Sequence, residues 1–140
     1  MKKLLLCPPT YYSIKYERNP WMDIDNPINQ AKVNEEYETL KYAYRALGIE
    51  YEELSPVADL PDEVFTADLG HAEKKMYIKA NFKYPERVKE ADRGEQYFRE
   101  KGFEIKTLPD GIFFEGGDVL KIGDRYFFGY GKRSSKEARP

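Results

Sequence analysis

The sequence predicts an α/β fold made of repeated units, and three observations support this prediction. Short apolar segments alternate with turns rich in proline and glycine, which is typical of strands. Between them lie segments whose apolar residues step by three and four, as along one face of a helix. Matched residues also recur at close to fifty positions, with offsets of 54, 48, 49 and 47 for Gly48 and Gly102, Asp62 and Asp110, Tyr77 and Tyr126, and the segments 89–91 and 136–138.

The first part of the chain is predicted to hold a strand, a long loop, a helix and a second strand. Residues 3–7 are apolar from Leu4 onward and are followed by two prolines, so we expect a short buried strand there. Residues 10–29 show no period but carry aromatic side chains, which predicts a packed loop or lid. A helix begins at Gln30 and ends at Gly48, and residues 49–54 form a strand. The apolar face of this helix consists of Val33, Tyr37, Leu40, Tyr44 and Leu47.

The rest of the chain repeats strands and helices. A second helix is predicted from Pro85 to the stop at Gly102, with turns at 109–111 and 123–124. The predicted strands are 64–70, 76–82, 103–108, 113–122 and 126–130. Such units cannot bury their faces alone, and a third helix should begin near Pro140. We therefore expect residues 1–140 to form a single partial domain of a longer repeat architecture.

Composition narrows the class of protein. The 140 residues include 23 basic and 25 acidic side chains, for a net charge of -2, so we expect neither nucleic acid nor a membrane as partner. The apolar run at residues 4–7 is too short for a signal peptide or a spanning helix, which predicts a cytoplasmic protein. One cysteine and one histidine allow neither an internal disulfide nor a histidine-rich metal site, and we expect no cofactor.

Two acids interrupt otherwise apolar segments and are candidates for a binding site. Asp68 lies near the end of residues 64–70, and Glu115 lies within residues 113–120. Burying a carboxylate is costly unless it is paired, so acids in such places indicate a nearby cation. For one acid alone, a solvent-exposed strand end would be the simpler interpretation. Two acids at matching places in the repeat favour a shared acidic pocket that receives a metal ion or a guanidinium group.

Two arginines also match across the repeat. Arg87 follows Asp68 by 19 residues and Arg133 follows Glu115 by 18, and each is predicted to lie in the first turn of a helix. A cation there lies at the unfavourable end of the helix dipole, which suggests that an anion shares the place. A ligand with a guanidinium group and a carboxylate, such as an amino acid with a guanidinium tail, would satisfy all four side chains.

A metal site is the competing interpretation. Its oxygen ligands would come from Asp62, Asp68, Glu115 and Asp118, but these acids are scattered and fit no spaced loop motif. His71 is predicted to lie in an exposed turn, and Cys7 is predicted to be a small apolar residue within a buried strand. We assign neither residue to catalysis and no residue to a metal.

The chain resembles the N-terminal half of the guanidino-group-modifying superfamily, which holds arginine deiminases, dimethylarginine dimethylaminohydrolases and amidinotransferases. The Phe-Thr-Ala-Asp of residues 65–68 and the Glu-Gly-Gly-Asp of residues 115–118, at this separation, are the specific features. Further matching segments are 7–9, 19–22, 60–64, 84–87 with Glu90, 119–120 and 129–134. The resemblance implies an αβ-propeller (the pentein fold) of five units, of which this chain would supply about two and a half.

The resemblance also implies roles. Asp68 would grip the substrate guanidinium, and Glu115, as part of the catalytic set, would hold that guanidinium and a catalytic histidine. Arg87 and Arg133 would receive the substrate carboxylate, and Asp62 would help to line the pocket. In the family a cysteine thiolate attacks the guanidinium carbon and a histidine moves the proton. Both residues lie in the other half of the family's chain, so we expect the 140 residues to be inactive alone.

Three functions are possible. The first is the substrate-gripping half of an enzyme that acts on the guanidinium C–N bond of arginine or methylarginine, completed by a C-terminal half or by self-association. The second is a non-catalytic binding module for arginine-like ligands. The third is an acid-rich metal-binding domain. Some relatives carry Asn where this chain has Asp68, so the acid favours deiminase or methylarginine hydrolase chemistry.

Overall fold

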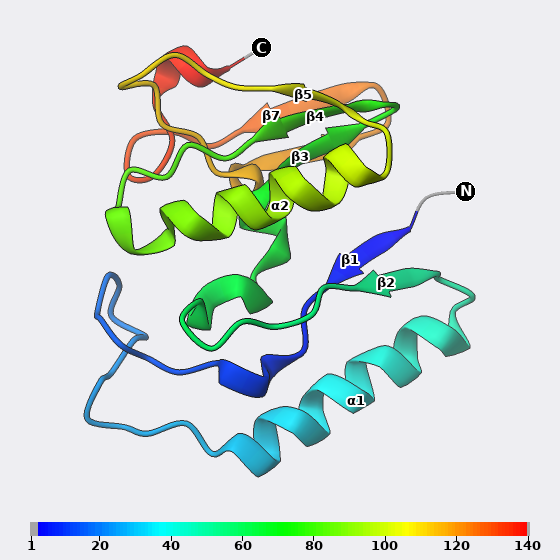
Figure 1. The fold of residues 1–140 in the computed structure, drawn as a ribbon, viewed down its shortest axis with the longest axis vertical. Coiled ribbons are helices and arrows are strands. Elements are labelled where there is room, and N and C mark those ends of the chain that lie inside the picture. The colour runs from blue at the N-terminus through cyan, green and yellow to red at the C-terminus, as the bar shows by residue number, and fades with distance from the viewer. Residues whose placement is uncertain (1–2, 140) are drawn as a thin grey trace. The chain divides into compact units, whose positions relative to one another are not determined.

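The computed structural model describes residues 3–139, and their backbone contacts separate two compact units, residues 1–65 and 66–140 (Figure 1). Each unit has its own strands and its own helix. The single partial domain expected from the sequence stays a prediction.

The first unit is a β-α-β arrangement. Strand β1 (Leu4–Leu6) pairs in parallel with β2 (Tyr51–Glu53), and helix α1 (Gln30–Ala46) connects them. The Asn29 side chain caps α1 by accepting a hydrogen bond from the Lys32 amide at 3.1 Å, and Gly48 follows the helix with a φ of +68°. Both strands and the helix therefore lie where the sequence predicts them.

Only part of the predicted apolar face of α1 is covered. Val33, Tyr37 and Tyr44 are half-buried, and the Tyr37 hydroxyl donates to Glu53 Oε1 at 2.6 Å on β2. By contrast, Leu40 and Leu47 are exposed, at 41% and 72% of their surface. The spacing therefore identified the helix correctly, while two leucines of its apolar face are exposed.

The long loop after β1 is packed at some residues and open at others. It begins with the 3₁₀ turn Pro9–Tyr11, and its Tyr12 ring meets Phe65 edge-on at 5.8 Å. Gln30 Nε2 donates to the Pro9 carbonyl at 2.5 Å, which joins the turn to the start of α1. Trp21, however, is 85% exposed. The packed-loop prediction therefore holds for the tyrosine and not for the tryptophan.

The second unit contains a three-stranded sheet with a helix on one face (Figure 1). Strand β4 (Met76–Lys79) pairs antiparallel with β3 (Gly70–Glu73) and in parallel with β5 (Glu104–Lys106). Helix α2 (Val88–Glu100) connects β4 to β5 after the 3₁₀ turn Pro85–Arg87.

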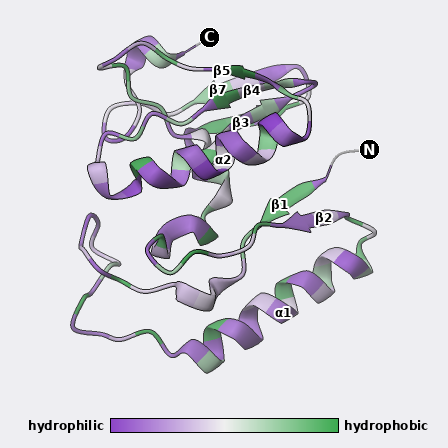
Figure 2. Ribbon diagram, in the orientation of Figure 1, coloured by the Kyte–Doolittle hydropathy of each residue, from purple (hydrophilic) through white to green (hydrophobic). Residues whose placement is uncertain are grey.

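Tyr77 is the centre of this unit's core. It is 1% exposed, its ring stacks on Phe98 of α2 at 4.1 Å, and its hydroxyl donates to the Leu69 carbonyl at 2.5 Å. Gly94 of α2 faces it, and a Cβ there would collide with the Tyr77 hydroxyl. The close approach of α2 to the sheet therefore depends on this glycine. Green apolar and purple polar positions alternate along α2, as expected for a helix with one buried face (Figure 2).

A second hairpin follows in the same unit. Strand β6 (Val119–Ile122) pairs antiparallel with β7 (Arg125–Phe128) across a turn at Gly123, whose φ is +59°. Upstream of it, Phe114 forms an isolated bridge with Asn81. The chain then passes through a loop and the 3₁₀ turn Lys136–Ala138.

The structure corrects three predicted elements. Residues 64–70 are not a strand but mainly the 3₁₀ turns Pro61–Val64 and Thr66–Leu69, and the first part of 113–122 holds the 3₁₀ turn Gly116–Asp118. His71 is not in an exposed turn, because it lies in β3, half-buried, with its ring edge-on to Tyr126 at 6.1 Å. The two apolar aromatic segments resemble strands in composition, but tertiary contacts fold them into tight turns instead.

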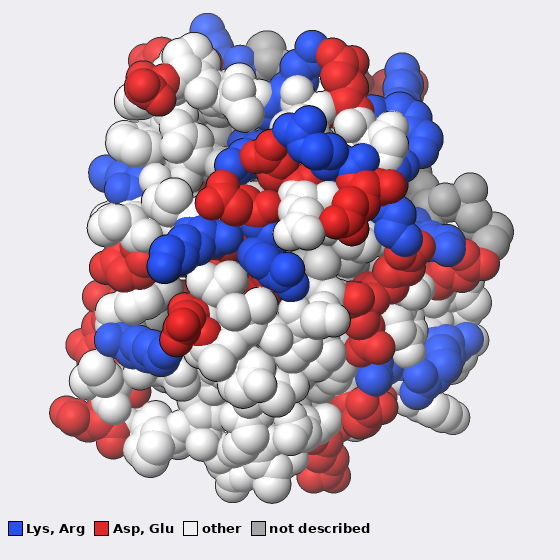
Figure 3. Space-filling view, in the orientation of Figure 1, with Lys and Arg blue, Asp and Glu red and all other residues white. Residues whose placement is uncertain are grey.

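Where charged side chains gather on the face drawn in Figure 3, basic and acidic ones lie next to each other, and the lower centre of this face carries few charges. Over residues 3–139, no helix is both long and apolar enough to cross a membrane.

Candidate functional site

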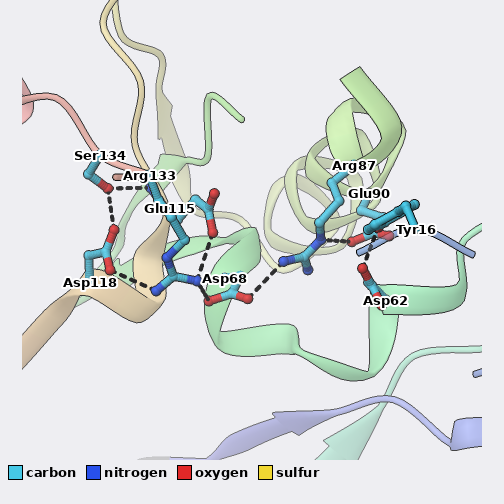
Figure 4. Close-up of polar contacts among 9 residues, drawn as sticks. All are labelled: Tyr16, Asp62, Asp68, Arg87, Glu90, Glu115, Asp118, Arg133 and Ser134. Carbon is cyan, nitrogen blue, oxygen red and sulfur yellow. Dashed lines mark hydrogen bonds and ion pairs between the residues drawn. The ribbon is translucent and has the colours of Figure 1, made fainter. Parts of the chain in front are cut away.

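The second unit brings three carboxylates to one guanidinium group (Figure 4). Arg133 Nη1 donates to Glu115 Oε2 at 2.9 Å and to Asp68 Oδ1 at 3.2 Å. Its Nη2 donates to Asp118 Oδ1 at 2.7 Å. The structure therefore confirms the predicted convergence of Asp68 and Glu115, which lie within the span of a single guanidinium group.

Asp68 is held from two sides. It lies in the 3₁₀ turn Thr66–Leu69, and its second oxygen, Oδ2, accepts from Arg87 Nη1 at 2.8 Å. Arg87 also donates through Nε to Glu90 Oε2 at 2.7 Å, and its guanidinium carbon lies 4.6 Å from the centre of the Phe82 ring. Both oxygens of Asp68 thus face arginines, one from each matched position of the sequence.

The Glu-Gly-Gly-Asp segment has a steric explanation in the structure. Glu115 precedes the 3₁₀ turn Gly116–Asp118. A Cβ on Gly116 would collide with the backbone of Gly70, and one on Gly117 would collide with Asp68 Oδ1. The two glycines therefore allow the turn to approach the neighbouring backbone and the neighbouring carboxylate closely.

Ser134 fixes the second half of the cluster. This serine is 3% exposed, its hydroxyl donates to Asp118 Oδ2 at 2.6 Å, and it accepts from the Glu115 amide at 3.0 Å. Next to it, Ser135 pairs with Phe113, donating through its amide at 2.9 Å and accepting at its hydroxyl at 3.0 Å. Residues 133–135 are thereby fastened along residues 113–118.

Burial changes the pKa of Glu115 and of the two arginines in the cluster. Burial raises the pKa of Glu115 above its ordinary value, with Arg133 opposing this rise and Asp68 adding to it. Burial would lower the pKa of Arg133, but hydrogen bonding to Asp118 and the charges of the surrounding carboxylates outweigh burial and raise it. The pKa of Arg87 is likewise raised, because Glu90 and Asp68 overcome the effect of burial. Four carboxylates thus share two arginines, and the pKa of Glu115 is raised despite the nearby Arg133.

Asp62 belongs to the first unit. It lies in the 3₁₀ turn Pro61–Val64, is 5% exposed and accepts a short hydrogen bond from the Tyr16 hydroxyl, as Figure 4 also shows. Its neighbour Glu63 faces Cys7, with 3.8 Å between Oε2 and Sγ. A carboxylate beside a buried thiol disfavours the thiolate, so this cysteine lacks the setting of a nucleophile.

Three features of the predicted site are corrected. Asp68 and Glu115 do not occupy equivalent positions in the repeat. When the two hairpins are aligned by their strand pairing, Gly70 corresponds to Val119 and Lys79 to Phe128, an offset of 49 residues. With this offset, the residue that corresponds to Asp68 is Gly117. Neither acid lies in a strand. Arg133 lies in the irregular segment before the 3₁₀ turn Lys136–Ala138, not in a helix, whereas Arg87 does lie at the start of α2.

Three members of the cluster were not identified as such from the sequence. Asp118, Ser134 and Glu90 all lie in segments that resemble the superfamily, but the resemblance gave none of them a role, and only the metal interpretation assigned one to Asp118. The signal was present, since Asp118 closes the Gly-Gly-Asp turn and Ser134 adjoins Arg133. Among residues 3–139, no group of three or more His, Cys, Asp or Glu side chains is placed to hold a metal ion.

Comparison with known proteins identifies the family. The family profile described as N,N dimethylarginine dimethylhydrolase, eukaryotic, matches residues 11–138. The chain belongs to the N,N dimethylarginine dimethylhydrolase family. The resemblance noted from the Phe-Thr-Ala-Asp and Glu-Gly-Gly-Asp segments is thereby confirmed.

Two curated relatives extend this assignment. The chain is 30% identical over 138 residues to N(G),N(G)-dimethylarginine dimethylaminohydrolase of Mycobacterium tuberculosis, covering 98% of this chain and 45% of that protein. It is 32% identical over 142 residues to the bifunctional arginine dihydrolase/ornithine cyclodeaminase ArgZ of Synechocystis, covering 99% of this chain and 20% of that protein. The chain thus spans half or less of the length of these family members.

A solved structure agrees with the α/β fold. The N-terminal domain of ArgZ, a cyanobacterial arginine dihydrolase solved with its substrate bound, matches with a TM-score of 0.89 and 30% identity. The match covers 97% of this chain and 51% of that domain. The chain is therefore similar in fold to about half of a solved arginine dihydrolase domain.

Proposed function

We propose that this chain is the substrate-gripping part of an enzyme that breaks a guanidinium C–N bond of arginine or a methylarginine. The observation that carries the proposal is the convergence of Asp68, Glu115 and Asp118 on one guanidinium group. A carboxylate matches the forked donors of a guanidinium two at a time, so the cluster has the donor–acceptor geometry that such a substrate requires.

Each side chain has a role in this proposal. Asp68 binds the substrate guanidinium, and Glu115 holds the same group and belongs to the catalytic set. Arg87 and Arg133 receive the substrate carboxylate, and Asp62 lines the pocket. The two arginines and Asp62 bind and orient the substrate and do not act on the reacting atoms.

The nucleophile is assigned to a segment outside the 140 residues. Cys7 is the chain's one cysteine, and it is 2% exposed and faces a carboxylate. The enzyme would be completed by a C-terminal half, giving a five-unit propeller of which this chain forms about two and a half units. A cytoplasmic location stays a prediction.

Binding in solution tests the proposal. Titration with L-arginine should shift the backbone NMR signals of Gly116, Gly117 and Ser134, and L-lysine at the same concentration should not. Asp68→Ala should abolish the shifts, because it removes the carboxylate between the two arginines. An unshifted spectrum at saturating L-arginine would reject guanidinium binding by the chain.

An activity assay separates the two leading functions. We expect no citrulline from L-arginine with the 140-residue chain, because C–N cleavage in this family requires a thiolate. Arginine binding without turnover also fits the second candidate, a non-catalytic binding module, because the buried Cys7 beside Glu63 is consistent with both functions. Citrulline production that survives Cys7→Ala would require another nucleophile and would contradict our assignment.

A further inference from the structure

We infer that Arg133 is an internal substitute for the substrate: its own guanidinium occupies the carboxylates of Asp68 and Glu115 and is exchanged for the guanidinium of the incoming ligand. This inference rests on the proposed function and deepens it. It also assigns to Arg133 a part in choosing among guanidine ligands.

Both guanidiniums need the same oxygens. Arg133 Nη1 lies between Asp68 Oδ1 and Glu115 Oε2, at 3.2 and 2.9 Å. The other oxygen of Asp68 already accepts from Arg87. A ligand guanidinium gripped by Asp68 and Glu115 would therefore meet a like charge in its place, and one of the two must leave.

Arg133 is the arginine able to leave. Its side chain is 39% exposed, whereas that of Arg87 is 9% exposed. Arg133 lies in an irregular segment two residues after Gly131, whose φ of +119° is a backbone conformation that favours glycine. Arg87, by contrast, is fixed at the start of α2 by Glu90.

Arg133 also has an anchor outside the contested oxygens. Nη2 donates to Asp118 Oδ1 at 2.7 Å, and Ser134 holds the other oxygen of Asp118 at 2.6 Å. The guanidinium can thus give up Nη1's two contacts and retain that of Nη2. Its released donors then become available to a carboxylate on the same ligand.

The exchange has a consequence for specificity. A simple guanidine displaces Arg133 but offers no anion to it, so the displaced cation loses two carboxylates without replacement. A ligand with both a guanidinium and a carboxylate replaces them. Arg133 therefore penalises ligands that carry only half of the required groups, and this penalty acts before any chemistry.

The test measures binding of guanidinium ion, with sodium ion as the reference, to the wild type, Arg133→Ala and Lys132→Ala. Occupancy by Arg133 reduces the competent fraction of the site, so Arg133→Ala should bind guanidinium about tenfold more tightly than wild type. Lys132→Ala removes an equal charge from the adjacent exposed residue and should leave the affinity unchanged. L-arginine should gain less than guanidinium from Arg133→Ala, because this ligand loses its carboxylate partner.

A second measurement does not depend on the folding of a variant. In the wild type labelled with ¹⁵N-arginine, the Nε–H signal of Arg133 should move when L-arginine is added, while that of Arg125 stays in place. Equal guanidinium affinity in wild type and Arg133→Ala would overturn the exchange while leaving the proposed function intact. An unmoved Arg133 signal under saturating L-arginine would contradict both the exchange and the proposed carboxylate-binding role of Arg133. Tighter guanidinium binding by Arg133→Ala without any L-arginine binding would support the exchange and reject the proposed substrate.

Discussion

The two hairpins of the second unit share a plan but differ in burial. Both are antiparallel, both come after a 3₁₀ turn that carries an acid of the cluster, and Tyr77 and Tyr126 occupy matching positions. Yet Tyr77 is 1% exposed and Tyr126 is 42% exposed. The difference arises from the elements after each hairpin, because α2 and β5 cover and extend β4, and among residues 3–139 β7 pairs with β6 alone. A hairpin pattern thus specifies strand pairing, while burial depends on the next helix and strand.

The largest effect should distinguish the two matched tyrosines. Tyr77→Ala removes the ring stacked on Phe98 and the hydroxyl bound to Leu69, and should reduce the free energy of unfolding by about 3–5 kcal/mol. Tyr126→Ala, at the matching exposed position, should reduce it by less than about 1 kcal/mol. Urea denaturation of both variants measures the difference. Equal losses would show that the second hairpin is as well packed as the first.

A second experiment tests the outer surface of β6 and β7. The exposed apolar side chains on one face of this hairpin are Leu120, Ile122 and Phe127, at 58%, 59% and 52%. We expect the chain to self-associate at micromolar concentration through such surface, and Leu120→Glu with Phe127→Glu to reverse this. Light scattering measures it, with Leu40→Glu on α1 as the control. A monodisperse monomer would contradict the prediction and favour a self-contained binding module.

The third prediction concerns the turn between the hairpins. Gly116→Ala forces a methyl group against the Gly70 backbone and should cost about 1–3 kcal/mol, with weaker arginine binding because Glu115 is displaced. Gly129→Ala meets its nearest atoms at 3.8 Å or more and serves as the control. Thermal unfolding compares the two. A neutral Gly116→Ala would mean that the first hairpin does not restrict the turn of the second.

The smallest effect is a pH dependence. Burial raises the pKa of Glu115 above its ordinary value of 4.5, so the folded state binds this proton more tightly than the unfolded state. The contribution to stability is therefore complete below about pH 4.5 and is lost as pH rises through the folded pKa. Carboxyl ¹³C NMR should show Glu115 titrating above 4.5, and Glu53, whose pKa its hydrogen bond from Tyr37 lowers, titrating below it. A Glu115 titration at or below 4.5 would contradict the burial cost.

The elements predicted well are those specified by local residues. Gly48, Gly102 and Gly123 end helices or turn strands with positive φ, and each lies where the sequence predicts a stop or a turn. Strand β3 was missed because Gly-His-Ala-Glu has little strand propensity of its own and is formed by pairing with β4. Local chemistry therefore located the turns, whereas tertiary pairing decided this strand.

The candidate site was predicted for a partly incorrect reason. Asp68 and Glu115 do converge, but the hairpin register shows that Gly117, rather than Glu115, corresponds to Asp68. The sequence predicted that the two arginines bind the carboxylate of a ligand, whereas in the structure they pair with Asp68 and Glu115. A sequence pattern can indicate that opposite charges belong to one place, but the choice of partner depends on atomic distances.

The ion pair between Arg133 and Asp68 has a consequence for the order of folding. The two residues are separated by 65 positions, and Lys121 and Glu73, which join β6 to β3, are separated by 48. Hairpins close through neighbours in the chain, so we expect both to form before these distant contacts are made. During synthesis at about 5–20 residues per second, Arg133 is added several seconds after Asp68, so the ion pair between them cannot form earlier. We therefore expect the carboxylate cluster to be among the last parts of the unit to assemble.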